Sequence, residues 1–298
     1  MPNRDSAHLP PLLGDSPRSH LVTANRLRHH LLEWGESGPV VVLLHGYLEH
    51  AHTWHMVAPR LVAAGYHVYG LDWRGHGDSE WIGAGGYYHF ADYTADLAAI
   101  VPQLAERVAL VAHSMGGGAA VTYTGTFPDR VSALVSVEGL GVPDSDPDIA
   151  PDRHREWVED LARLAERTPR RFTLEAAERR LHEGVFRFSA EAARHMAEHG
   201  TRADGDARSW KFDPLHQTGS PQPYYTAQAR AFWRRVTCPV LYIDGSDSPL
   251  ALPATELDDR LRILRAQRVT IPGAGHHPHL QRPDSFSDEV VKFLETTF

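Results

Sequence analysis

The chain has 298 residues and a formal net charge of −8, from 30 basic and 38 acidic side chains. This length suits one large α/β domain with an insertion, and the negative charge disfavours nucleic acid as a partner, because phosphate binding needs a basic face. Apolar residues make up 42% and charged residues 23%, which excludes long disordered stretches. The single cysteine, Cys238, excludes an intramolecular disulfide and is compatible with a reducing compartment.

The first twenty residues are rich in Pro, Ser and Asp, and we expect residues 1–20 to form an N-terminal tail. They lack the apolar core of a signal peptide. Nowhere does the sequence approach the ~18 consecutive apolar residues of a membrane span. We therefore expect a cytoplasmic protein without a membrane partner.

Short apolar runs recur along the chain, each closed by Gly, Asp or His. They occupy residues 30–35, 39–46, 65–77, 107–114, 130–139, 238–245 and 267–276. Runs such as VVVLL and VALVA do not alternate between apolar and polar, which is typical of strands buried on both faces. The pattern predicts a mostly parallel sheet covered by helices on both faces.

Helical periodicity appears between these runs. Residues 93–106 place apolar side chains on one face, with a bend or restart expected at Pro102. Strand signals stop over residues 142–236, a charged and helix-prone stretch that we interpret as an inserted helical cap. Its clearest apolar stripe consists of Trp157, Val158, Leu161 and Leu164. The core of the fold is then formed by residues 21–141 and 237–298.

The stretch LVAHSMGGGAA places Ser114 between a buried strand and a patch of very small residues. A nucleophilic serine needs an exposed oxygen on a tight turn, and a helix start crowding neighbouring strands needs small side chains. The pattern resembles the nucleophile elbow of the α/β-hydrolase superfamily, with Ala112 in place of the usual first glycine. The resemblance predicts a serine hydrolase with the α/β-hydrolase fold.

Three further motifs carry the resemblance. His45-Gly46 at the end of an early strand resembles the superfamily's oxyanion loop, which implies that the N–H groups of Tyr47 and Met115 form the oxyanion hole. Residues 72–79, LDWRGHGDSE in context, resemble a loop that is chiefly structural in these enzymes. His276, after a Gly-Ala-Gly turn, stands where the superfamily carries its general base.

The acid that orients the base is open between two residues. Asp247 lies in the loop after the strand that follows the cap, but one residue before the usual position, which is Ser248. Glu138 ends the strand after the elbow helix, where relatives resembling haloalkane dehalogenases and lactonases carry their acid. We prefer Glu138 and retain Asp247 as the alternative, since a carboxylate must lie within ~3 Å of the imidazole.

The chain has 20 histidines, a residue type that commonly binds metal ions. The two short-spaced groups are His50, His52 and His55, and His276, His277 and His279. Neither H-E-x-x-H nor paired C-x-x-C occurs, so we expect no metal and no cofactor.

The substrate class follows from the elbow and its implied triad. We expect hydrolysis of a small apolar ester, lactone or related acyl compound through an acyl-enzyme. Epoxide and haloalkane cleavage are disfavoured, since such enzymes carry an aspartate in place of Ser114. The alternatives are carbon–carbon bond hydrolysis, perhydrolysis, or a small-molecule receptor with little turnover. The sequence leaves assembly into a homo-oligomer open.

Overall fold

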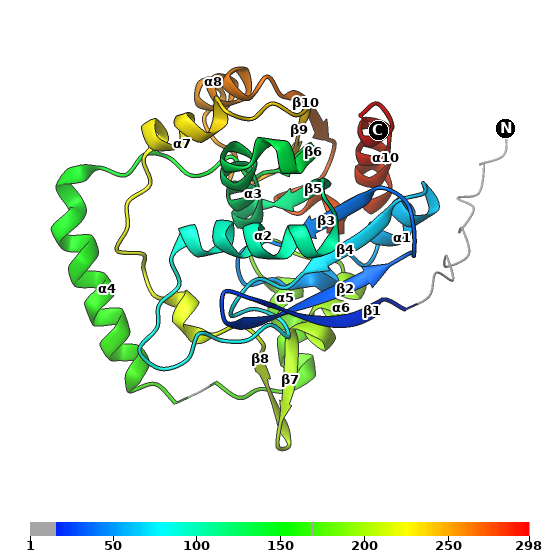
Figure 1. Cartoon of the computed structure of the whole chain (residues 1–298). Coiled ribbons are helices and arrows are strands. Elements are labelled where there is room, and N and C mark those ends of the chain that lie inside the picture. The colour runs from blue at the N-terminus through cyan, green and yellow to red at the C-terminus, as the bar shows by residue number, and fades with distance from the viewer. Residues whose placement is uncertain (1–15, 169, 298) are drawn as a thin grey trace, which may run out of the picture.

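The computed structural model describes residues 16–168 and 170–297, and it is built on one eight-stranded sheet (Figure 1). The strand order is β1-β2-β4-β3-β5-β6-β9-β10. The strands are β1 (Arg18–Ala24), β2 (Leu27–Trp34), β3 (Val40–Leu44), β4 (His67–Leu71), β5 (Val108–His113), β6 (Val131–Val137), β9 (Val240–Gly245) and β10 (Gln267–Ile271). From β4 to β10 all neighbours are parallel, and only the β1·β2 and β2·β4 pairs are antiparallel. The predicted mostly parallel sheet is confirmed.

Helices cover both faces of this sheet. One apolar core lies under α2 (Phe90–Leu104), α3 (Ser114–Thr126), α7 (Thr226–Trp233) and α8 (Ala254–Leu264). The other lies under the 3-10 turn η1 (Ala51–Trp54), α1 (Ala58–Ala63) and α10 (Pro283–Glu295). Figure 1 shows α2 with α3 on one side of the strands and α1 with α10 on the other. Every residue of β5 is buried, as a central strand between two helical layers requires.

The structure differs from the sequence-based expectation at three places. Helix α2 runs through Pro102 without restarting and ends at Leu104, so the missing N–H falls in its last turn, where the disruption is small. The tail predicted for residues 1–20 lies mostly outside the described residues, but Arg18 to His20 already belong to β1. The sequence did not predict β1, because its first four residues are exposed at the edge of the sheet and form no apolar run.

The third difference concerns the stretch between β6 and β9, which holds α4 (Ala150–Ala165), α5 (Leu174–Glu183), α6 (Ala190–Gly200) and a hairpin of β7 (Thr201–Asp204) and β8 (Ala207–Trp210). Its described residues add no strand to the main sheet. The apolar stripe of α4 was expected to pack, yet no residue of α4 is fully buried and Val158 is 56% exposed. Figure 1 shows α4 standing away from the sheet, and Trp157 of its stripe packs edge-on against Tyr87, with ring centroids 5.6 Å apart.

None of the helices in the described part of the chain combines the length and apolar character needed to cross a lipid bilayer.

Candidate active site

The central feature of the site is the turn between β5 and α3. The strand ends at His113 and the helix begins at Ser114, whose φ of +49° lies in the left-handed region. That conformation is unfavourable for a residue with a side chain and persists only where the surrounding structure imposes it. The turn therefore holds the Ser114 hydroxyl out at the end of a buried strand.

The small residues after Ser114 are required by close backbone contacts. A Cβ added at Gly116 would lie 2.5 Å from the carbonyl oxygen of His45, and one at Gly117 would lie 2.6 Å from the Cα of Gly139. Both distances are well below van der Waals contact. Helix α3 can thus start between β3 and β6 only with glycines at these positions.

His276 connects the serine to a carboxylate. Its Nε2 lies 3.0 Å from Ser114 Oγ, and its Nδ1 lies 2.8 Å from Glu138 Oε2. The side chains of His276 and Glu138 are 7% and 3% exposed. Because a carboxylate accepts only, the Nδ1–H of His276 donates to Glu138, and Nε2 is left with a lone pair toward the Ser114 hydroxyl. This is the geometry of a Ser-His-acid triad.

Glu138 is fixed by donors from the loop after β9. Oε1 accepts from the N–H of Gly245 at 2.9 Å, and Oε2 accepts from the hydroxyl of Ser248 at 2.6 Å. Burial alone would raise the pKa of Glu138, but the hydrogen bonds from His276, Gly245 and Ser248 outweigh it, and the pKa is lowered. The carboxylate is therefore ionised near neutral pH.

Asp247 does not contact His276. It is exposed, its Oδ1 accepts from the Ser246 hydroxyl, and its own N–H donates to Ala274 O. The structure brings Glu138, the preferred acid, to the histidine and leaves the alternative outside the triad. Ser248 occupies the usual acid position in the sequence and donates to the carboxylate that replaces it.

The two residues expected to form the oxyanion hole lie in the turns that follow β5 and β3. Met115 lies in the first turn of α3, where backbone N–H groups have no acceptor within the helix. Tyr47 follows Gly46 after β3. The preceding His45 is fully buried, donates from Nδ1 to Gly46 O at 2.7 Å and accepts the N–H of Trp73 on Nε2 at 3.0 Å. Burial lowers the pKa of His45, so the ring stays neutral in this tautomer.

The loop over residues 72–79 braces the oxyanion segment, in keeping with the structural role expected from the resemblance. The buried His76 accepts the N–H of Leu48 on Nε2 at 3.3 Å. Asp72 accepts the N–H groups of Ala51 at 2.6 Å and Asp78 at 2.9 Å. The His76 ring and the Asp72 carboxylate thus hold two adjoining loops together, and neither contacts the triad.

A buried group that the sequence reasoning missed lies behind the triad. Glu49 Oε1 lies 2.9 Å from His113 Nδ1 and 3.0 Å from His277 Nε2, and Oε2 accepts the N–H of Gly46 at 3.2 Å. His113 Nε2 bonds the carbonyl oxygen of His276 at 2.8 Å. Burial favours neutral His113, but the adjacent Glu49 carboxylate raises its pKa overall. No local motif signals this group, because its members come from the end of β5 and from two separate loops.

One aromatic side chain of the residue 142–236 stretch covers the base. Phe186 stacks on His276 with ring centroids 5.5 Å apart and planes at 26°. Gln281 holds it in place, accepting the N–H of Gly275 and donating to Phe186 O. Phe186 therefore shields one face of the imidazole from water.

A serine on a strand-to-helix turn, bonded through histidine to a buried carboxylate, defines the class of site found in acyl-transferring hydrolases. The family model for the alpha/beta hydrolase fold matches residues 39–283. The chain belongs to the α/β-hydrolase family and is a hydrolase of that fold.

Known relatives fit this assignment. The chain is 26% identical over 276 residues to a serine hydrolase-like protein of Danio rerio, covering 88% of this chain and 83% of that protein. It is 36% identical over 130 residues to epoxide hydrolase A of Mycobacterium tuberculosis, spanning 43% of this chain and only 40% of that enzyme. The solved structure of a hypothetical protein from Pseudomonas aeruginosa PAO1 superposes with a TM-score of 0.81 at 30% identity, covering 92% and 96% of the two chains.

Proposed function

We propose that the protein is a serine hydrolase that cleaves a small apolar ester, lactone or related acyl compound through a covalent acyl-enzyme. The observation that carries the proposal is the continuous chain of contacts from Ser114 Oγ through His276 to Glu138, at 3.0 and 2.8 Å. The serine hydrolase-like relative of similar length is consistent with it.

In the proposed mechanism Ser114 attacks the acyl carbon while His276 Nε2 takes the hydroxyl proton. The N–H groups of Tyr47 and Met115 donate to the oxyanion, each contributing about 3 kcal/mol to transition-state stabilisation. His276 then passes its proton to the leaving alkoxide, and the acyl-enzyme forms. In the second half, His276 takes a proton from a water molecule as that water attacks the acyl carbon. The bond from the acyl carbon to Ser114 Oγ then breaks, and His276 returns the proton to Ser114 Oγ as the acid leaves.

Apolar surface beside the nucleophile supports an apolar acyl group. Phe186 covers the base, Tyr47 is 49% exposed, and Phe90 is 45% exposed with its ring against Gly118 in α3. Exposed aromatic rings on and beside the segments that carry the proposed nucleophile and oxyanion donors would gain by burying an apolar substrate. Similarity to an epoxide hydrolase covers 43% of this chain and does not favour epoxide opening. By the resemblance stated in the sequence analysis, enzymes of that kind carry an aspartate in place of Ser114.

Covalent labelling with a fluorophosphonate tests the nucleophile directly. We expect one label per wild-type chain, located on Ser114 by peptide mass spectrometry, and none on Ser114→Ala. A panel of p-nitrophenyl esters of increasing chain length, together with simple lactones, then measures acyl preference.

Failure of the folded wild-type chain to be labelled would refute the proposed nucleophile and favour a small-molecule receptor. Labelling without turnover of any ester or lactone would favour cleavage of another bond, such as a carbon–carbon bond, by the same site.

A further inference from the structure

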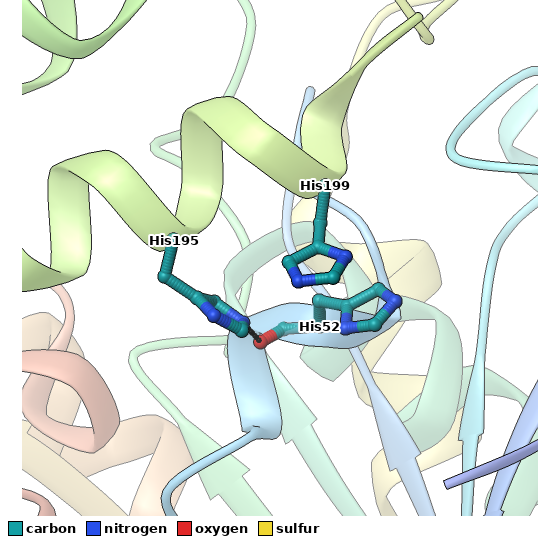
Figure 2. A group of neighbouring side chains, drawn as sticks. All are labelled: His52, His195 and His199. Atoms are coloured by element: carbon teal, nitrogen blue, oxygen red, sulfur yellow. Dashed lines mark hydrogen bonds between the residues drawn. The ribbon is translucent and has the colours of Figure 1, made fainter. Parts of the chain in front are cut away.

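Three histidines that are distant in sequence meet between α6 and the turn η1. His195 and His199 lie one helical turn apart on α6, and both hang from the helix toward His52 of η1, as Figure 2 shows. One nitrogen atom from each ring lies within 4.8 Å of one from each of the others. This group, the His52–His195–His199 cluster, is outside the triad.

The rings are packed together without using their nitrogens on one another. His52 and His199 are stacked with centroids 3.7 Å apart, and His195 stands edge-on to His52 at 5.7 Å. Within the described residues, neither imidazole nitrogen of His52 or of His199 has a hydrogen-bond partner in the protein. All three residues are half-buried, so the cluster is not enclosed in the core.

The chemical state of the rings suits a metal. The Nε2–H of His195 donates to the carbonyl oxygen of His52 at 3.2 Å, which leaves a lone pair on Nδ1. A backbone carbonyl on the second nitrogen is the usual support for a metal-binding histidine.

Two other groups of His, Asp and Glu side chains also lie close together, but they do not offer free ligand atoms in the same way. In the group of Glu49, His113 and His279, all three are buried, and Glu49 already holds His113 and His277. In the group of His30, Asp72 and Asp78, the Asp72 oxygens accept from His30 and from two backbone N–H groups. Neither group has unused donor atoms converging on an accessible space.

We propose that His52, His195 and His199 bind one divalent transition-metal ion of the zinc type, with a water molecule in the fourth position. Imidazole is a preferred ligand of such ions. Tetrahedral zinc places ligand nitrogens about 3.3 Å apart, so nitrogens that now lie up to 4.8 Å from one another must close by as much as about 1.5 Å. The stacked rings of His52 and His199 must also turn, so that their lone pairs converge on one ion. The proposal departs from the sequence-based expectation of no metal, which weighed only short-spaced motifs.

The ion would join two parts of the fold that the backbone does not connect directly. α6 belongs to the stretch between β6 and β9, whereas η1 follows the oxyanion loop. A neighbouring contact already holds them, since His50 Nε2 bonds the carbonyl oxygen of Met196 at 3.2 Å. The nearby Lys211 opposes a cation, but its ammonium group is paired with Asp78 at 2.6 Å. A bound ion would therefore fasten α6 over the segment that carries Tyr47.

Zinc binding to the full chain, purified without a histidine tag, tests the proposal by isothermal titration calorimetry. We expect one ion per chain. His199→Gln and His195→Gln should each weaken binding by about tenfold or more. His154→Gln, at an exposed histidine on α4, is the matched control and should bind like wild type.

Cobalt(II) supplies a second readout that does not depend on catalysis. Wild type should develop the strong visible absorption of tetrahedral Co²⁺, and His52→Gln should lose it. Absence of stoichiometric zinc binding to wild type would overturn the proposal, and so would binding that is equally strong in the His195, His199 and His154 variants. Circular dichroism of each variant separates loss of a ligand from loss of the fold.

Discussion

Replacing Glu138 by glutamine tests the assignment of the triad acid with little change in shape. The carboxylate accepts three hydrogen bonds, from His276, Gly245 and Ser248, whereas a glutamine presents an NH₂ group to at least one of these donors. If that NH₂ faces His276, the ring must accept on Nδ1, and its proton moves to Nε2. The imidazole then points an N–H at Ser114 and can no longer take the serine proton.

The expected loss is large. A triad histidine held in the wrong tautomer loses about 10⁴-fold in kcat, or about 5.4 kcal/mol of transition-state stabilisation. Initial rates on the best p-nitrophenyl ester measure the loss, and the rate of fluorophosphonate labelling should fall with it. Asp247→Asn is the matched control and should leave both rates close to wild type, because Asp247 is exposed and away from His276.

The reasoning is refuted if Glu138→Gln, shown to be folded by circular dichroism, keeps more than about a tenth of the wild-type kcat. A comparable loss in Asp247→Asn would move the acid to the loop after β9.

Three other predictions concern buried and paired charges. Glu49→Gln leaves protonated His113 without its buried partner, so we expect a loss of about 3 kcal/mol in urea unfolding. Ser248→Ala removes a donor from Glu138 and so raises the pKa of that carboxyl, and the acidic limb of the kcat/KM profile should move to higher pH. Glu33 is buried, which by itself raises its pKa, but hydrogen bonds from a neighbouring arginine and histidine lower the pKa from 4.5 to about 2. Its contribution to stability is therefore present above pH 4.5 and disappears as the pH falls toward 2, and Glu33→Gln should flatten urea-derived stability over that range.

Each of these has a contrary outcome. A change below about 1 kcal/mol in Glu49→Gln would mean that the pair is not needed for stability. An unmoved acidic limb in Ser248→Ala would show that its hydroxyl does not tune the triad. An equally steep acid transition in Glu33→Gln would assign that transition to other carboxyl groups.

The local parts of this molecule could be predicted from sequence because they are encoded over a few neighbouring residues. The apolar runs without alternation predict the parallel sheet, because strands buried on both faces need apolar residues throughout. The small residues after Ser114 predict the tight turn, because close packing there excludes larger side chains. The same reasoning placed His276 after the last strand. It preferred Glu138 as the acid but kept Asp247 as the alternative, because a shift of one residue in a loop decides a contact of about 3 Å.

Contacts between segments that are distant in the sequence could not be predicted. His195 and His52 are separated by 143 positions, and nothing local to either indicates the other. The spacing of His195 and His199 on one helix face was the only available signal. Likewise, periodicity gave α4 an apolar face but could not tell whether another layer would cover Val158. An exposed edge strand such as β1 carries too few buried positions to be recognised.

Glu138 directly follows β6, so the loop between β9 and α8 does not have to supply the triad acid. Nucleophile and acid both belong to the continuous run from β5 through α3 to the end of β6, and the later loop contributes only the supporting groups of Gly245 and Ser248. The residues after Ser248 in that loop therefore take no part in proton transfer. Evolution or a protein engineer can lengthen, shorten or regraft this segment to reshape the entrance while the reactive groups stay on a rigid frame.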